Sequence, residues 1–390
     1  MREIPALILG DDPVNVLGVA RNLGRLGIPV IRIGSSENKT LCSRYIVSCH
    51  VYDDLEDCSD YQYVDRLLTA VKKLGGRAVV FPLSDIHVLR VSSNRIALSA
   101  DLFLHTPELT VVETLVNKRK FYESMRRYDM PHPASMYPET EEEFLAAGER
   151  IGYPVFLKPE ISPLFARRFK VKGLITRNAD EMSSNYRALK GSRMDVVVQE
   201  IIPGSADCMH GCAGVVTPDR FASFCYQRIR EFPEGFGCGS LLKSVPDFSN
   251  QTRLAEYFAN IGYSGIFDAE FKRDPRDQQF KMIEINARSW WQNSLPTSAG
   301  FNIIKTTYDF AIGRPVERSA YQSDVLWMHL YNDFHAGRSS GMGLGSWLWG
   351  LKSVSSFDVW ADDDKGPMWA FLADMISRKA KKLTGGGDSA

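Results

Sequence analysis

Two short segments of the chain combine several side chains that bind metal ions and phosphates. The segments Phe267-Asp-Ala-Glu-Phe-Lys272 and Met282-Ile-Glu-Ile-Asn-Ala-Arg288 alternate apolar and polar residues, as β-strands with one buried face do. The polar segment 273–279 between them predicts a turn, so the two strands should pair. Pairing would bring four polar side chains together, namely Glu270, Glu284, Asn286 and Arg288.

These side chains predict a site for a metal ion beside a phosphoryl group. Glu284, Asn286 and Arg288 occupy alternate positions of one strand, so they share a face. Carboxylate and carboxamide oxygens suit Mg²⁺ that is bound together with phosphates. The neighbouring guanidinium suits a transferred phosphoryl group. The alternative is a solvated outer face of a hairpin, but the strongly apolar residues in between argue against it.

This pattern resembles the metal-binding end of the ATP-grasp superfamily, and further segments match that family in order from about residue 115 to 310. The segment Asn117-Lys-Arg-Lys-Phe121 resembles the element whose lysine opens the nucleotide-binding region, so Lys118 is the matching residue. The segment Tyr153-Pro-Val-Phe-Leu-Lys-Pro159 resembles the lid strand with a second lysine, here Lys158. A lysine reaches a phosphate as a mobile point charge, although a lone lysine is more commonly a surface residue.

The next two matches imply contacts to the adenine and the ribose. The segment Val196-Val-Val-Gln-Glu-Ile-Ile-Pro-Gly204 resembles the strand that ends at the adenine hinge. The resemblance implies that Glu200 and the backbone of Ile202 meet the adenine. Asp207 falls where the family places the acid that holds the ribose hydroxyls. The alternative for Glu200 is a solvated carboxylate at a strand end.

The chain departs from the family pattern after Lys158. Many relatives carry a glycine-rich loop there, whose backbone amides hold phosphates. Segment 160–173 contains little glycine, and we expect basic side chains to replace the amides, with Lys172 as the named candidate among Arg167, Arg168, Lys170 and Lys172. The alternative is a solvated basic loop.

A pair of arginines is the candidate grip for a substrate. Arg228 and Arg230 lie two residues apart in a predicted strand that starts at Tyr226 and runs into a glycine-rich turn ending near Ser240. Relatives that ligate carboxylates resemble this arrangement, which suits bidentate binding of a carboxylate or an acyl phosphate. Cross-strand charge pairing is the alternative for either arginine.

The amino-terminal third alternates strands and helices: strand 4–10, a helix to about residue 26, strand 28–33, helix 63–74 and strand 78–82. This order predicts a doubly wound parallel sheet. A dinucleotide-binding dehydrogenase is the rival, but the first turn, from Gly10 to Gly18, lacks G-x-G-x-x-G and carries two aspartates that would repel a pyrophosphate. The region resembles a preATP-grasp domain. Four residues at its strand ends either line the acceptor-substrate side or cap turns: Asp11, Asp12, Ser84 and Asp85.

Composition sets the frame for these motifs. Lys plus Arg and Asp plus Glu both total 47 in 390 residues, which gives no electrostatic case for nucleic-acid binding. A hydrophobic fraction of 44% indicates an ordered globular protein. No secretory signal and no run long enough to span a bilayer is visible, and the seven scattered cysteines favour a reducing compartment, so we expect a cytoplasmic protein.

The expected fold class is α/β and α+β: a doubly wound parallel preATP-grasp domain, then an ATP-grasp fold with a lid subdomain and an antiparallel-sheet carboxy-terminal subdomain. The expected domains are residues 1–112, the lid-containing part 113–198, the nucleotide- and Mg-binding part 199–320 and an extension 321–390. We also expect one helix from Val111 to Tyr128, a Gly/Ser-rich break from Gly337 to Ser346 and a docking helix over 368–383, with membrane contact not expected.

The resemblance implies an ATP-dependent carboxylate–amine ligase of the D-aspartate ligase kind, also similar to carbamoyl-phosphate-synthetase ATP domains. ATP and Mg²⁺, with Mn²⁺ as an alternative, would be the cofactors, and small carboxylates and amines the partners. A carboxylate–thiol ligase, a kinase and a non-catalytic nucleotide-binding module remain as alternatives. Homodimers are common in relatives, but nothing in the sequence shows one.

Overall fold

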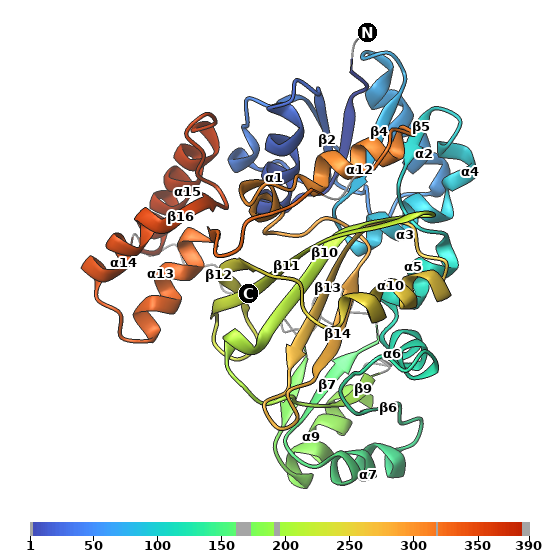
Figure 1. Cartoon of the computed structure of the whole chain (residues 1–390), viewed down its shortest axis with the longest axis vertical. Helices are drawn as coiled ribbons and strands as arrows, with labels where there is room; N and C mark the ends of the chain where they lie inside the picture. The colour runs from blue at the N-terminus through green and yellow to red at the C-terminus, as the bar shows by residue number, and fades with distance from the viewer. Residues whose placement is uncertain (1–2, 161–172, 191–195, 317–318, 384–390) are drawn as a thin grey trace.

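The computed structural model of the chain describes residues 3–160, 173–190, 196–316 and 319–383. Figure 1 shows three β-sheets along the long axis of the molecule, with the amino-terminal sheet at the top and the smallest sheet at the bottom. The large central sheet lies between them, so its strands can meet side chains from both neighbours.

The first sheet is parallel throughout, in the order β3-β2-β1-β4-β5. Its strands are β1 (Ala6–Leu9), β2 (Val30–Gly34), β3 (Ile46–Val51), β4 (Ala78–Pro82) and β5 (Leu102–Leu104). The connecting helices are α1 (Pro13–Gly24), η1 (Lys39–Leu41), α2 (Asp60–Lys72), α3 (Asp85–Ser93) and α4 (Arg95–Leu98). The predicted doubly wound sheet is confirmed. Buried β1, β2 and β4 read as continuous apolar runs because helices cover both faces.

The smallest sheet has the order β6-β9-β7-β8, and its pairs are antiparallel. It consists of β6 (Ser135–Met136), β7 (Val155–Pro159), β8 (Leu174–Thr176) and β9 (Val196–Glu200), with α7 (Glu141–Ile151) and α9 (Ala179–Lys190). Leu157 and Val198 pack on Phe144 of α7 in one small core. Because β7 alternates, Phe156 and Lys158 point away from that core.

The central sheet has seven strands in the order β14-β13-β10-β11-β12-β15-β16. They are β10 (Met209–Thr217), β11 (Arg220–Phe232), β12 (Cys238–Val245), β13 (Gly265–Arg273), β14 (Phe280–Asn286), β15 (Leu326–Met328) and β16 (Val354–Phe357). The helices α5 (Leu109–Val116), α6 (Lys118–Arg127) and α10 (Gln251–Asn260) contribute buried residues to the core on this sheet. Residues beyond 320 therefore extend this same sheet by two strands.

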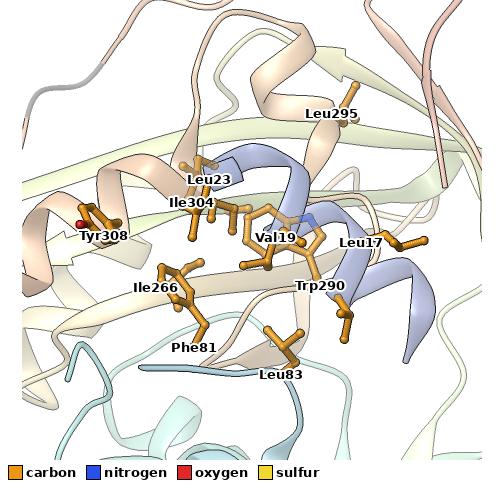
Figure 2. Packing of buried hydrophobic residues seen from close by; sticks show 14 of the residues in the cluster. Leu17, Val19, Leu23, Phe81, Leu83, Ile266, Trp290, Leu295, Ile304 and Tyr308 are labelled. Atoms are coloured by element: carbon orange, nitrogen blue, oxygen red, sulfur yellow. The ribbon is translucent and has the colours of Figure 1, made fainter. Parts of the chain in front are cut away.

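One hydrophobic core joins the first sheet to the central sheet. Figure 2 shows α1 side chains packed with residues of β4, β13 and the segments after β14. The shorter helices η2 (Ala206–Cys208), α11 (Ser294–Ser298) and α12 (Ile303–Ala311) complete this half of the molecule. The labelled members of the cluster are Leu17, Val19, Leu23, Phe81, Leu83, Ile266, Trp290, Leu295, Ile304 and Tyr308. Burial of so many large side chains fixes the two sheets relative to one another.

The single helix predicted from Val111 to Tyr128 is wrong, because the chain breaks at Asn117 into α5 and α6. Asn117 has an extended backbone, with ψ at 115°, and its side chain accepts a hydrogen bond from the amide of Lys120 at 2.9 Å. Asparagine is a favoured N-cap because its side chain satisfies an amide that the helix leaves unpaired. The break places Lys118 at the first position of a new helix.

The carboxy-terminal part consists of α13 (Leu330–Ser339), α14 (Leu344–Gly350), η3 (Leu351–Ser353) and α15 (Gly366–Leu383). The predicted Gly/Ser-rich break is too long, since only residues 340–343 separate α13 from α14. The predicted helix over 368–383 is confirmed, and it packs on η1 of the first domain. Within the described part of the chain, no helix has the length and apolar character needed to cross a membrane.

Candidate active site

The hairpin β13–β14 brings the predicted carboxylates into direct opposition. Glu270 pairs with Glu284 across the two antiparallel strands, and Asp268 pairs with Asn286 two residues further along. The register of the two strands shifts at a bulge just after Glu270. Bulges next to active sites commonly change the direction in which a side chain points. The predicted strands and their pairing are confirmed. Two carboxylates at opposed positions repel each other unless a cation lies between them.

Two basic side chains approach this acidic pair. Lys118 Nζ lies 3.5 Å from Glu284 Oε2, and Arg228 Nη2 lies 3.5 Å from Glu270 Oε2. Lys118 is buried, and a buried lysine requires a negatively charged partner. Both contacts are at the outer limit of hydrogen bonding, so a more strongly bound cation or anion can replace them.

Arg288 follows β14 and lies against the same cluster. Its Nε donates to Asp85 Oδ1 at 2.8 Å, and its Nη2 donates to Asn286 Oδ1 at 2.9 Å. Its Nη1 donates to the carbonyl of Ser289 at 3.1 Å. Burial lowers the pKa of Arg288, but the carboxylates of Asp85 and Glu284 outweigh burial, so the pKa lies above its ordinary value. The guanidinium is thus a fixed and permanently charged group.

Asp268 belongs to the cluster, although the motif analysis did not select it. It is buried and accepts a 2.7 Å hydrogen bond from the hydroxyl of Tyr226. Its Oδ2 lies 3.5 Å from the side-chain nitrogen Nδ2 of Asn286. Burial, followed by the charge of Glu270, raises the pKa of Asp268 to about 8. The sequence could have predicted this, because Asp268 and Glu270 are two residues apart in a strand and therefore share one face.

The donor set fits a magnesium ion that binds together with phosphates. Among the described residues, no three His, Cys, Asp or Glu side chains form a complete metal site by themselves. Glu270 and Glu284, with the Asn286 carboxamide, instead offer a partial shell of hard oxygen ligands. Mg²⁺ in nucleotide enzymes is commonly held by one or two carboxylates and completed by phosphate oxygens and water. The pKa of Asp268 is raised first by its burial and second by the negative charge of Glu270 in the same cluster.

Lys158 reaches the same region from the small sheet. Its Nζ donates to the hydroxyl of Tyr122 at 3.3 Å, and that hydroxyl in turn donates to the carbonyl of Ile283 in β14 at 2.7 Å. Tyr122 lies four residues after Lys118 on α6, so both project from one helix face. Lys158 is therefore linked to β14 through Tyr122, a residue that the sequence motifs did not include, whereas Lys118 contacts β14 directly at Glu284.

The predicted adenine and ribose residues have other contacts in the structure. Glu200, at the end of β9, accepts from the amide of Ala134 at 3.0 Å and from the guanidinium of Arg276. Burial raises the pKa of Glu200, but Arg276, the amide of Ala134 and Lys281 together outweigh burial, and the net shift of the pKa is downward. Ile202 is buried, and Asp207 accepts from the hydroxyl of Ser205. Their nucleotide contacts stay predictions.

The two predicted substrate arginines have different surroundings. Arg228 is held by Glu231 at 2.8 Å and approaches Glu270, so it lies at the acidic pair. Arg230 makes two 2.8 Å bonds to Asp333 of α13, a fully buried carboxylate that also accepts from Trp347 at 2.9 Å. Arg230 thus forms an ion pair with a helix carboxylate and not the cross-strand pair named as the alternative. Its substrate role stays a prediction.

Lys172 lies outside the described residues, as do its neighbouring candidates Arg167, Arg168 and Lys170. Of the residues expected at the acceptor side, Asp12 caps α1, and Ser84 caps α3 by accepting from the amide of His87. Asp11 is held by Arg32 and two serines. Asp85 alone of these four reaches the hairpin cluster.

Comparisons with known proteins agree with this architecture. No protein-family model matches the chain. The D-aspartate ligase of Enterococcus faecium is 26% identical over 352 residues, which covers 84% of this chain and 82% of that protein. The carbamoyl phosphate synthase arginine-specific large chain of Halalkalibacterium halodurans is 22% identical over 341 residues, 80% of this chain but only 30% of that protein.

Solved structures share the fold at lower identity. An L-amino acid ligase from Bacillus licheniformis superposes with a TM-score of 0.61 at 16% identity, over 81% of this chain and 76% of that chain. The biotin carboxylase domain of Hydrogenobacter thermophilus 2-oxoglutarate carboxylase, solved with MgADP and bicarbonate, gives 0.62 at 18% identity, over 83% and 74%. The sequence similarity along most of its length and the common fold make this chain similar to ATP-grasp carboxylate–amine ligases.

Proposed function

We propose that the protein is an ATP-dependent ligase that activates a substrate carboxylate as an acyl phosphate and couples it to an amine, with release of ADP and phosphate. A free carboxylate is a poor electrophile, and phosphorylation gives it a leaving group. Mg-ATP supplies the phosphoryl group when it binds. The task of the protein is then to place the reactants and to neutralise charge.

The observation that carries this proposal is the opposition of Glu270 and Glu284 beside Asn286 and Arg288. Glu270 and Glu284 would hold the metal, with Asn286 completing the shell. Arg288 would stabilise the transferred phosphoryl group, because its charge and planar donors suit bidentate binding of phosphoryl oxygens.

The lysines would act on the remaining phosphates. Lys118 approaches the cluster from α6, and Lys158 approaches it from β7. Lys158 lies on the small sheet, so closure of this sheet over a nucleotide would bring its charge to the phosphates and exclude water. Glu200, Ile202, Asp207 and Lys172 complete the proposed nucleotide site, and Arg228 and Arg230 the proposed substrate grip.

The names of the relatives support the substrate class. D-Aspartate ligase and L-amino acid ligase are both named for the joining of amino acids. We therefore propose a carboxylic acid and an amine, at least one of them an amino acid, as substrates. A cytoplasmic location, a homodimer and domains at 1–112, 113–198, 199–320 and 321–390 are part of the same proposal.

A binding module without catalysis would not need to keep two opposed carboxylates with a buried lysine and arginine beside them. A carboxylate–thiol ligase and a kinase would use the same phosphoryl site, so the acceptor decides among them. The test measures ADP and phosphate release from Mg-ATP with a panel of carboxylic acids, each with an amine, with a thiol or alone. Release that requires an acid and an amine, with a C–N product by mass spectrometry, supports the proposal. Turnover only with a thiol, or with no acceptor, would contradict it.

A further inference from the structure

Asp85 connects the first domain to the candidate site. Its carboxylate accepts from Arg288 Nε at 2.8 Å, although the two residues are 203 positions apart in the chain. Asp85 is the first residue of α3, at the carboxyl end of β4, whereas Arg288 follows β14 of the central sheet. A side chain from one sheet therefore sets the orientation of a predicted phosphoryl-binding group on another.

The bonds of Arg288 leave part of its guanidinium available. A guanidinium has five N–H donors in a fixed planar arrangement. Three of them are used, by Asp85, Asn286 and the carbonyl of Ser289. Among the described residues, the other two donors, one on each Nη, have no partner. Two planar donors of this kind suit bidentate binding of a phosphoryl oxygen pair.

The backbone of Asp85 is itself held in place. Ser84 caps α3 by accepting from the amide of His87 at 3.2 Å, which fixes the first turn of the helix. A carboxylate in that turn is stabilised by the unpaired amides and the helix dipole. Asp85 is thus a rigid, charged reference point rather than a mobile surface side chain.

The ion pair is not required to hold the two sheets together. Asn15 of α1 donates to the carbonyl of Ser289 at 2.9 Å, and Asn293 donates to the side chain of Asn15 at 3.0 Å. The shared core of Figure 2 lies around these contacts. Loss of one partly exposed ion pair would leave this interface in place.

We propose that Asp85 is a positioning residue that orients Arg288 so that its two remaining donors face the transferred phosphoryl group. This inference rests on the proposed function. An unrestrained arginine side chain loses rotamer entropy when it is ordered. Asp85 orders the side chain before the nucleotide binds, so that cost is not incurred in the transition state, where preorganised charge has its largest effect.

The test compares the binding of MgADP with that of MgADP plus aluminium fluoride, a mimic of the phosphoryl group in transfer, by calorimetry. Asp85→Asn keeps the shape of the side chain and removes its charge. We expect it to change MgADP affinity by less than about twofold and to weaken the aluminium fluoride complex by about 10- to 100-fold, the usual range for loss of a group that orients a ligand-binding residue. The same factor should appear in kcat rather than in KM for ATP.

Asp60→Asn is the matched control. Asp60 is also the first residue of a helix, follows a serine cap and pairs with an arginine, Arg90, at 3.2 Å, but it belongs to α2. It should leave both affinities unchanged. Thermal melts of both variants report whether the fold is kept.

A double-mutant cycle separates positioning from an independent role. In an Arg288→Met background, Asp85→Asn should have no further effect on the aluminium fluoride complex. If the two losses multiply, or if Asp85→Asn weakens MgADP equally, the proposal is overturned. It is also overturned if the unmodified protein binds the mimic no more tightly than MgADP. Tight binding of the mimic without any C–N product would instead refute the proposed ligase while leaving the role of Asp85 intact.

Discussion

At the scale of single residues, the opposition of Glu270 and Glu284 is the feature most directly tied to chemistry. Two facing carboxylates repel each other and lower the stability of the folded protein. A metal ion bound between them would remove this repulsion. Lys118 approaches Glu284 and Arg228 approaches Glu270, each at 3.5 Å. These residues should therefore affect metal dependence strongly and the stability of the metal-free protein little.

Glu284→Gln tests this expectation. The change removes one predicted metal ligand and one of the two like charges, so Mg-dependent ATP turnover should fall by at least about 100-fold, and half-maximal activity should need more Mg²⁺. The metal-free variant should melt close to the unmodified protein, because the loss of one like charge offsets the loss of the partner of buried Lys118. Titration of Mg²⁺ against ADP release checks the first part, and calorimetric melting in EDTA the second. Glu123→Gln, an exposed change on α6, serves as the control. Full turnover with an unchanged Mg²⁺ dependence would refute the metal assignment.

At the scale of elements, alternation along a strand carried most of the information in the sequence. The hairpin, its pairing and the parallel first sheet were predictable because a buried face imposes a period of two or a continuous apolar run. The break at Asn117 was not predicted, because the residues on both sides of it form helices. The break is marked only by a local hydrogen bond to the side chain of Asn117. Partners distant in sequence, such as Asp333 for Arg230 and Asp85 for Arg288, depend on how the sheets pack and could not be predicted from the sequence.

Asn117 is the test at this scale. Its carboxamide caps α6 at Lys120 and donates to Glu160 Oε2 at 3.2 Å. Asn117→Ala should lower the free energy of unfolding by about 0.5–2 kcal/mol, because a helix amide loses its partner. It should also weaken ATP binding, since Lys118 is the next residue. Urea unfolding and calorimetry with ATP check the two effects.

Asn117→Ser provides the control for that experiment, because serine keeps the cap and loses only the contact to Glu160. It should stay close to the unmodified protein in both measurements. Equal losses for the alanine and serine variants would show that the cap does not position Lys118.

At the scale of the whole molecule, the first domain and the central sheet behave as one packed unit. Gly265 begins β13 with φ of +133°, and a Cβ at this position would lie 2.1 Å from the carbonyl of His105. The backbone of the central sheet thus approaches the end of β5 closely, and His105 itself is buried against Phe81 of β4. A side chain at residue 265, or a charge at residue 105, would strain this contact.

The stability of this unit should therefore fall in mild acid. Burial, the largest cause, and the charge of Arg95 together lower the pKa of His105 to about 4, although backbone hydrogen bonds oppose this shift. Burial is also the main reason why the pKa of His87 is lowered to about 4. The charge of Asp11 raises this pKa, and the charge of Arg90 lowers it. An unfolded histidine titrates near pH 6.5, so below that pH the unfolded chain binds more protons. The stabilisation is complete above pH 6.5 and is lost as pH falls toward 4, by up to about 3 kcal/mol for each histidine.

His105→Phe separates this effect from general acid denaturation. Phenylalanine keeps a ring against Phe81 and cannot be protonated, so the variant should lose less stability than the unmodified protein between pH 6.5 and pH 4. Urea unfolding at half-unit steps of pH measures the slope of each curve, and the difference between the curves at pH 7.5 gives the packing cost of the larger ring. That cost is independent of pH and cancels in the slopes. Parallel curves over the whole interval would mean that His105 is not buried in its neutral form. That result would also refute the tight junction between the two sheets.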